Sequence, residues 1–281
     1  MKKLNLILAA TLIVLFASEA SADRWGKIRI ATEGAYAPWN SMDASGKLIG
    51  FEIDLAYDLC KRMNAQCEIV AQAWDGIIPA LQAGKYDAIM AGMSITEKRK
   101  KVITFSRNYA ATPAKFVVRK DSPFASFKTS LNRITFEDVS AGEKAAIAEI
   151  VKTFKGKAVG VQTATTHENF LRKYLGDDVT IRTYDTQENL DLDLQAGRID
   201  TALAAMSYWV PLLKSGKGKD MKMVGPGMTG GPFGAGVGVG IRQKDQVLAD
   251  KFSKAINQAI QDGTLSKLAV QWFGFDASVK K

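Results

Sequence analysis

A short apolar run passes directly into a polar loop in YDAIMAGMSITEKR, residues 86–99. Residues 86–90 have the composition of a buried strand. The loop then places the Ser94 hydroxyl, backbone groups and the Arg99 guanidinium within one turn of chain, and a guanidinium matches a carboxylate two atoms to two. We predict a clamp for an anion the size of an α-carboxylate. On charge alone, the alternative that Arg99 belongs to a solvated basic run at 98–101 stays open.

Before this segment, strands alternate with helices. The expected order is β-α-β-α-β, at residues 27–32, 51–63, 67–71, 77–83 and 88–90. Phe51, Leu55 and Leu59 fall on one face of the first helix, as an amphipathic helix requires. This order predicts a parallel sheet flanked by helices, with ligands at the carboxyl ends of its strands.

The pattern restarts in the second half of the chain. Strands are expected at 114–119, 158–162, 179–184, 201–205, 221–223 and 235–241, and helices at 141–154, 165–174, 186–196, 247–261 and 265–273. We assign no chemistry to segment 122–155. The alternating glycines at 234–240 lack the spacing of a nucleotide loop and indicate close backbone approach. The sequence predicts an α/β protein of two lobes, with residues 23–112 and 230–281 in lobe 1, residues 113–229 in lobe 2, and a hinge of two crossovers.

Three segments carry a resemblance to a known family. IATEGAYAPW at 30–39, GFEIDL at 50–55 and the strand and loop at 86–99 resemble periplasmic solute-binding proteins of ABC transporters. The likeness is to the polar amino-acid group, which includes lysine/arginine/ornithine-, histidine- and opine-binding proteins, and it is closest to the opine binders. It covers most of the chain and implies a type-2 periplasmic binding protein fold, with the ligand between the lobes.

The first 22 residues have the features of a secretory signal peptide. Lys2 and Lys3 precede an apolar run at 4–17, and Ala20-Ser21-Ala22 forms a small-residue cleavage site. Such a run is too short to span a bilayer. We therefore expect a periplasmic protein.

Composition excludes several other classes of function. The formal charge is +9, but the lysines are scattered among acids and no basic block is interleaved with aromatic residues, so nucleic acid is not an expected partner. His167 is the single histidine, and the cysteines lack metal-ligand spacing, so we expect neither a zinc site nor a cofactor.

Cys60 and Cys67 are the two cysteines of the chain. An even count in an exported protein favours a disulfide. A continuous helix would hold two α-carbons seven residues apart at about 10 Å, too far to bridge. We expect the helix to end near Asn64 and the chain to turn back. Two buried free thiols are the alternative.

The resemblance assigns the carboxylate end of the ligand to both lobes. Arg99 would bind the α-carboxylate together with Ser94, in the loop that also holds Ala91, Gly92 and Met93. From lobe 2, backbone N–H groups and hydroxyls of Thr163, Thr165 and Thr166 would close on the same group. Simple helix capping is the alternative role for these threonines.

The resemblance also assigns the rest of the ligand. Tyr36 and Trp74 match aromatic positions that sandwich its side chain, and Glu33 matches an acidic position that faces its distal end. The alternatives are a core tryptophan and a solvated loop acid.

Departures from the family pattern point to the ligand class. Basic amino-acid binders have two serines where this chain has Ala91 and Gly92, and an aspartate for the α-ammonium where it has Ala205. A buried ammonium without a carboxylate partner is costly. We therefore expect a ligand whose nitrogen is substituted, an opine such as octopine, nopaline or a sugar-linked opine. Tyr208 and Trp209 are expected to line the enlarged pocket.

The function implied is ligand capture by hinge closure of a monomer, followed by docking on an ABC permease. A binder of free arginine, ornithine, lysine or histidine is the first alternative. A periplasmic cyclohexadienyl-type dehydratase is a remote one, for which Glu33 would be the general acid. A sensor domain is a third alternative.

Overall fold

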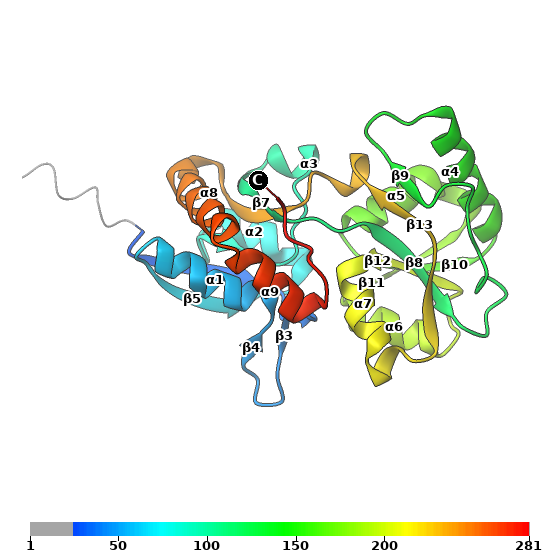
Figure 1. The fold of residues 1–281 in the computed structure, drawn as a ribbon, viewed down its shortest axis with the longest axis horizontal. Helices are drawn as coiled ribbons and strands as arrows, with labels where there is room; N and C mark the ends of the chain where they lie inside the picture. The colour runs from blue at the N-terminus through cyan, green and yellow to red at the C-terminus, as the bar shows by residue number, and fades with distance from the viewer. Residues whose placement is uncertain (1–24, 281) are drawn as a thin grey trace, which may run out of the picture.

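The computed structural model describes residues 25–280, and the expected signal peptide at 1–22 lies outside them. It confirms the predicted two-lobed α/β fold. Two sheets with their helices lie side by side, and a small hairpin projects from lobe 1 (Figure 1). Within 25–280, no helix is long and apolar enough to cross a membrane.

Lobe 1 is built on a five-stranded mixed sheet. Its order is β5 (Gln66–Ala71), β1 (Lys27–Thr32), β6 (Ala88–Ile89), β14 (Val237–Arg242) and β7 (Ile103–Ala110). β1 pairs in parallel with β5 and β6, whereas β14 is antiparallel to β6 and β7. The small antiparallel sheet comprises β2 (Ala35–Tyr36), β3 (Asn40–Met42) and β4 (Leu48–Ile49). The parallel strands β1 and β6 therefore end at the same edge, beside Glu33 and the 91–99 loop.

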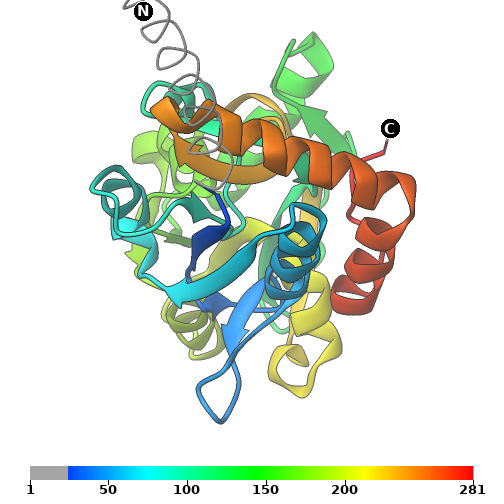
Figure 2. The ribbon, with the colours of Figure 1, turned by 90° about the vertical axis from the view of Figure 1, so that its left-hand side faces the viewer.

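Helices cover both faces of this sheet. They are α1 (Phe51–Arg62), α2 (Ile77–Gln82), the short α3 (Glu97–Lys100), α8 (Gln246–Gln261) and α9 (Thr264–Phe273). One core cluster packs α1, α8 and α9 against the sheet, and a second packs α2 against it. Phe51, Leu55 and Leu59 are buried in the first, as their spacing predicts. Figure 2 shows α8 running across lobe 1, with α9 turning from its end.

Lobe 2 is built on a six-stranded mixed sheet. Its order is β11 (Thr180–Tyr184), β10 (Ala158–Gln162), β12 (Thr201–Ala205), β8 (Ala114–Arg119), β13 (Met221–Thr229) and β9 (Arg133–Thr135). Its helices are α4 (Ala141–Phe154), α5 (Thr166–Tyr174), α6 (Gln187–Gln195) and α7 (Met206–Lys214). One cluster packs α4 and α5 on the sheet, and another packs α6 and α7.

The chain passes between the sheets twice, from β7 to β8 and from β13 to β14. The second crossover is glycine-rich because other backbone lies against it. A Cβ built on Gly234 (φ 79°) would stand 2.2 Å from the Ile95 carbonyl oxygen, and one on Gly236 (φ 90°) would stand 2.8 Å from the Ala110 carbonyl oxygen. The left-handed glycines delay the strand expected at 235–241, which begins at Val237.

The predicted disulfide is confirmed between Cys60 and Cys67, with their α-carbons 6.1 Å apart. Helix α1 ends at Arg62, and Asn64 takes a left-handed conformation with φ 53°. The Ala65 N–H then donates to the Cys60 carbonyl at 2.9 Å, which reverses the chain into β5.

Several parts of the fold were not predicted. Strand β7 carries polar residues that hide its pairing in the sequence, and helix α7 contains Pro211. Strand β9 and the small sheet β2–β4 are too short to give a period. These omissions matter because β7 leads into the first crossover, and because α7 supplies Tyr208, which stacks on Tyr36 of lobe 1, and Ser207, which accepts a hydrogen bond from Trp39 of lobe 1.

Candidate ligand-binding cleft

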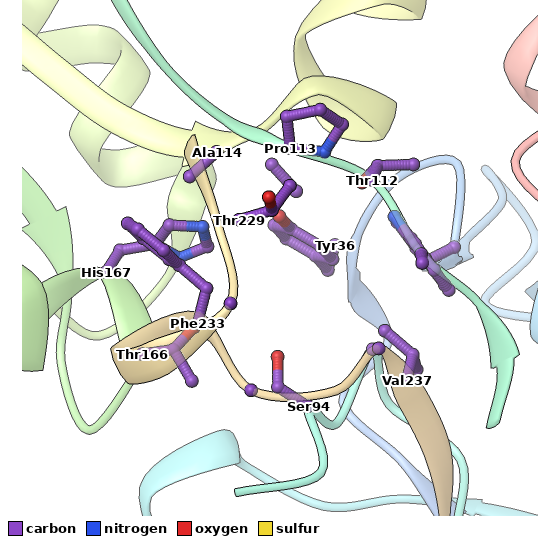
Figure 3. Close-up of a pocket in the computed structure, with 17 residues that line it drawn as sticks. Tyr36, Ser94, Thr112, Pro113, Ala114, Thr166, His167, Thr229, Phe233 and Val237 are labelled. Carbon is purple, nitrogen blue, oxygen red and sulfur yellow. The ribbon is translucent and has the colours of Figure 1, made fainter. Parts of the chain in front are cut away.

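Two adjoining cavities lie between the lobes, with volumes of about 160 and 40 Å³. We call them the hinge cavity and the clamp cavity. The hinge cavity is bordered by both crossovers, at 111–114 and 229–237 (Figure 3), and the clamp cavity by Arg99 and Glu33. Both are lined by Tyr36, Gly92, Ser94, Thr166 and His167. The two cavities therefore form one cleft.

Arg99 lines the clamp cavity from α3. Thr96 caps this helix and accepts a hydrogen bond from the Arg99 N–H at 3.2 Å. The guanidinium donates to the carbonyl oxygens of Ser94 at 2.9 Å and, across the cleft, of Ala164 at 3.3 Å. Within residues 25–280 it forms no ion pair, and burial lowers the pKa of Arg99 to about 10. The group stays cationic at neutral pH with N–H donors left for an anion.

Lobe 2 presents the amino-terminal end of α5 to the same cavity. Thr165 caps the helix, accepting from the Glu168 N–H at 3.2 Å and donating to the Gln162 carbonyl at 2.7 Å, so its hydroxyl is occupied. Thr166 lines both cavities at the first helical position. Thr163 lines neither, because its N–H donates to the Tyr184 carbonyl and its own carbonyl accepts from Trp74.

Two aromatic residues of lobe 1 wall the cleft. Trp74 is 8% exposed, its ring lies 5.2 Å from the Arg99 Cζ, and its Nε1 donates to the Thr163 carbonyl of lobe 2 at 3.0 Å. The ring of Tyr36 stacks on Tyr208 of lobe 2, with centroids 5.0 Å apart. Burial raises the pKa of Tyr36 above its usual range, so the phenol stays protonated.

The expectation that Tyr208 and Trp209 line the cleft needs correction. Tyr208 lies behind Tyr36, donates its hydroxyl to Asp191, and lines a separate groove with Pro38 and Leu212. Trp209 is buried in the lobe 2 core, where its Nε1 donates to the Lys115 carbonyl at 3.0 Å.

Glu33 lies at the end of the clamp cavity, where it accepts a hydrogen bond from the Gln162 amide of lobe 2 at 2.6 Å. Burial raises the pKa of Glu33 to about 7, and the negative charges of Glu52 and Glu188 act in the same direction. Among the residues that line the two cavities, Glu33 is the sole carboxylate.

The small residues named from the sequence occupy different places. Ala91 lines the clamp cavity, Gly92 both cavities, and Ala205 the hinge cavity. Met93 lines neither: its side chain is fully buried in lobe 1, with Sδ 3.2 Å from where a Cβ on Gly240 would stand. Ser94, next to it, presents its side chain to the hinge cavity (Figure 3).

Several lining residues were not anticipated. His167 lines both cavities, and its pKa falls to about 4 because it is buried and lies near the Arg99 charge, so the ring is neutral. Gln162 and Gln187 line the clamp cavity, while Phe233, Thr112 and Thr229 line the hinge cavity. His167 could have been predicted from its place in the sequence, because it directly follows Thr166 at the start of α5. Within 25–280, no group of three or more His, Cys, Asp or Glu residues could hold a metal ion.

Sequence comparisons place the chain in a known family. Residues 28–275 match the family described as bacterial extracellular solute-binding proteins, family 3. The octopine-binding periplasmic protein of Rhizobium meliloti is 39% identical over 294 residues, which cover 98% of this chain and 99% of that protein. The histidine-binding periplasmic protein of Salmonella typhimurium is also 39% identical, over 279 residues and 98% of each chain. The L-arginine-binding protein of Pseudomonas aeruginosa is 34% identical, again over 98% of each chain.

Solved structures share the architecture. An ancestral arginine-binding protein bound to arginine superimposes with a TM-score of 0.74 and 32% identity, over 89% of this chain and 99% of the other. A periplasmic His/Glu/Gln/Arg/opine family-binding protein from Silicibacter pomeroyi, in complex with lysine, gives a TM-score of 0.71 and 34% identity, over 90% and 99% of the two chains.

Proposed function

The chain belongs to family 3 of the bacterial extracellular solute-binding proteins, and from that premise we propose that it captures an opine in the periplasm for an ABC importer. An opine is an amino acid whose α-nitrogen carries a second organic group. The lobes close around one molecule and present it to a permease in the inner membrane. Closure is stabilised by contacts that both lobes make to the ligand.

One observation carries the proposal: among residues 25–280, the Arg99 guanidinium that lines the cleft has no ion pair and the Glu33 carboxylate that lines it has no cationic partner. A ligand carboxylate satisfies the free donors of Arg99, and a cationic or hydrogen-bonding distal end satisfies Glu33. Both groups also contact lobe 2 through Ala164 and Gln162, so their ligand contacts support closure.

The hinge cavity favours a substituted nitrogen over a free α-ammonium. It reaches Gly92, Ser94 and Ala205, and none of its lining residues is acidic. A free ammonium there would lose its water without gaining a carboxylate. The cavity instead offers volume and the hydroxyls of Thr112, Thr166 and Thr229 to a polar N-linked group. The octopine-binding relative supports this ligand class.

Calorimetric titration of the mature protein tests the ligand class. The panel is octopine, nopaline and mannityl opines against free arginine, ornithine, lysine and histidine. We expect the tightest binding from an opine. Sub-micromolar binding of a free amino acid without any response to opines would overturn the opine assignment.

Binding of free basic amino acids is the second candidate. The buried Glu33 carboxylate suits a guanidinium or ammonium, and relatives named for histidine and arginine match the same length of chain. In that case a water or the Ser94 hydroxyl replaces the missing carboxylate. The same titration separates the two ligand classes.

We propose that the bound molecule leaves chemically unchanged. A dehydratase needs a general acid in the cleft, and Glu33, with a pKa of about 7, is the residue suited to that role. Incubation with prephenate, followed by chromatography, tests for turnover. Recovery of intact prephenate and intact opine supports a transport function. A dehydrated product would instead show that the protein is an enzyme.

A further inference from the structure

Glu52, the second residue of α1, is 0% exposed and accepts hydrogen bonds on both carboxylate oxygens. Its Oε1 accepts from the Gly92 N–H at 2.8 Å and from the Tyr109 hydroxyl. Its Oε2 accepts from the Asn40 Nδ2 at 2.8 Å. Three donors on one carboxyl group match the ionised form, which can only accept.

These partners come from three segments that carry cleft residues. Gly92 lines both cavities itself. Asn40 extends the network, because its Oδ1 accepts from the Gly34 N–H at 2.8 Å, next to Glu33. Tyr109 is the penultimate residue of β7 and stands two residues before Ala111 of the first crossover, which lines the hinge cavity. Glu52 is therefore hydrogen-bonded to the 91–99 loop through Gly92, to the loop that carries Glu33 through Asn40, and to the strand before the first crossover through Tyr109.

Stability alone does not explain a carboxylate at this position. Within residues 25–280 no Lys, Arg or His side chain pairs with Glu52, and burial raises the pKa of Glu52. A buried charge without a cation is costly, and a neutral side chain of similar shape is often neutral or stabilising. Glu52 differs from such a neutral residue in one respect. It accepts three hydrogen bonds from segments around the cleft and so fixes their positions.

We propose that Glu52 is the positioning residue of the ligand site: its carboxylate holds Gly92, Asn40 and Tyr109 so that the lobe 1 half of the cleft is formed before the ligand enters. Glu52 lines neither cavity, so it acts through these partners and not by touching the ligand. This inference rests on the proposed function, since the effect that matters is on ligand capture.

Exchanging the carboxyl and amide groups provides the test. In Glu52→Gln, the amide oxygen at position 52 still accepts from Gly92 and Tyr109. The amide nitrogen, however, faces the Asn40 Nδ2, and because both groups are donors no hydrogen bond can form between them. Asn40 cannot flip without losing the Gly34 N–H. In Asn40→Asp, two carboxylates meet. The double variant E52Q/N40D restores every hydrogen bond, because the carboxylate then at position 40 accepts both from the Gly34 N–H and from the amide then at position 52.

The binding readout is calorimetry at pH 8 with octopine and arginine. We expect each single variant to lose about tenfold to a hundredfold in affinity, and the double variant to return to within about threefold of the wild type. The Gly92 amide proton resonance is expected to shift in E52Q and to recover in the double variant. Glu143→Gln is the matched control, because Glu143 accepts from backbone N–H groups of Thr135 and Ser140 in lobe 2, outside the lining of either cavity.

The outcomes separate the inference from the proposed function. If the wild type binds none of the opines and free amino acids of the titration panel, the proposed function fails and the inference falls with it. If the wild type binds and E52Q binds equally well, or if the losses of the single variants add in the double variant, the positioning role is wrong while the proposed function stands. If E52Q does not fold, the double variant and Tyr109→Phe decide: both are expected to fold, with Tyr109→Phe weaker in affinity than the wild type, and unchanged affinity in Tyr109→Phe contradicts the role.

Discussion

The Glu33 carboxylate of lobe 1 accepts a hydrogen bond from the Gln162 amide of lobe 2, with 2.6 Å between Oε1 and Nε2. This contact joins the two lobes at the end of the clamp cavity. Because burial outweighs the hydrogen bond, the pKa of Glu33 rises to about 7 from an ordinary value of 4.5. The residue proposed to face the distal end of the ligand therefore changes charge near neutral pH.

Affinity for a cationic ligand should consequently depend on pH. In the free protein Glu33 holds its proton below about pH 7, whereas a ligand guanidinium beside it favours the ionised form, so binding releases a proton. We expect the affinity for arginine or octopine to rise from pH 5.5 to 8. Calorimetry in buffers of different ionisation enthalpy measures both the affinity and the proton release.

Glu33→Gln is the control for this pH dependence, because Asp191, with a pKa raised to about 7 by burial, titrates in the same range. The variant should flatten the profile between pH 5.5 and 8. An equally steep profile in Glu33→Gln would assign the titration to another group.

Trp74 lines the clamp cavity and donates a hydrogen bond from its indole nitrogen to the Thr163 carbonyl of lobe 2. Trp74→Phe keeps an aromatic ring near Arg99 and removes the hydrogen bond to Thr163, so we expect a loss of about fivefold in affinity. Trp74→Ala also removes the cation–π contact and should cost about tenfold more. Equal losses in the two variants would show that the ring itself contributes nothing. Tryptophan fluorescence during titration provides the measurement.

Ala205 is the position that should set the choice between opine and free amino acid. Ala205→Asp places a carboxylate at the hinge cavity, whose lining residues include no acid. The new carboxylate could then pair with the α-ammonium of a free amino acid. We expect the affinity ratio of arginine to octopine to rise by about tenfold or more, since a charge-assisted hydrogen bond is gained. Ala205→Asn, similar in size and uncharged, should not change the ratio. A similar rise in Ala205→Asn would attribute the effect to size.

The Cys60–Cys67 disulfide should contribute modestly to stability. It closes a short loop at the end of α1, and the loop entropy at this length amounts to about 2 kcal/mol. Urea unfolding of the oxidised protein and of the Cys60→Ser/Cys67→Ser variant measures the difference. Ligand affinity should be unaffected, since neither cysteine lines the cleft; a loss of affinity would show that α1 transmits strain to Glu52.

Much of the fold could be predicted from the sequence, because the local pattern of apolar residues matches the residues that are buried in the folded protein. The strands at Lys27–Thr32, Ala114–Arg119, Ala158–Gln162 and Thr201–Ala205 have the predicted bounds, as does helix α4. Strand β7 was missed because its polar residues are paired by the rest of the lobe: Ser106 is buried, and its hydroxyl accepts from the Val239 N–H at 3.0 Å. Such a position has no signature in local hydrophobicity.

The site was predicted in part for the same reason. Arg99, Glu33, Tyr36 and Trp74 follow strands or precede helices in recognisable motifs, and all line the clamp cavity. Thr163 and Met93 stand in the same motifs, but their backbone or side-chain partners turn them away from the cleft. Phe233 and Glu52 escaped notice because their roles depend on contacts between segments far apart in the sequence, such as Glu52 with Tyr109.

The most direct measurement compares Arg99→Met with Lys98→Met by calorimetric titration with octopine and arginine. Arg99 lines the cleft, whereas Lys98 is an exposed member of the same basic run. If the guanidinium binds the ligand carboxylate, Arg99→Met loses about a hundredfold or more in affinity while Lys98→Met binds like the wild type. Wild-type affinity in Arg99→Met would contradict the account.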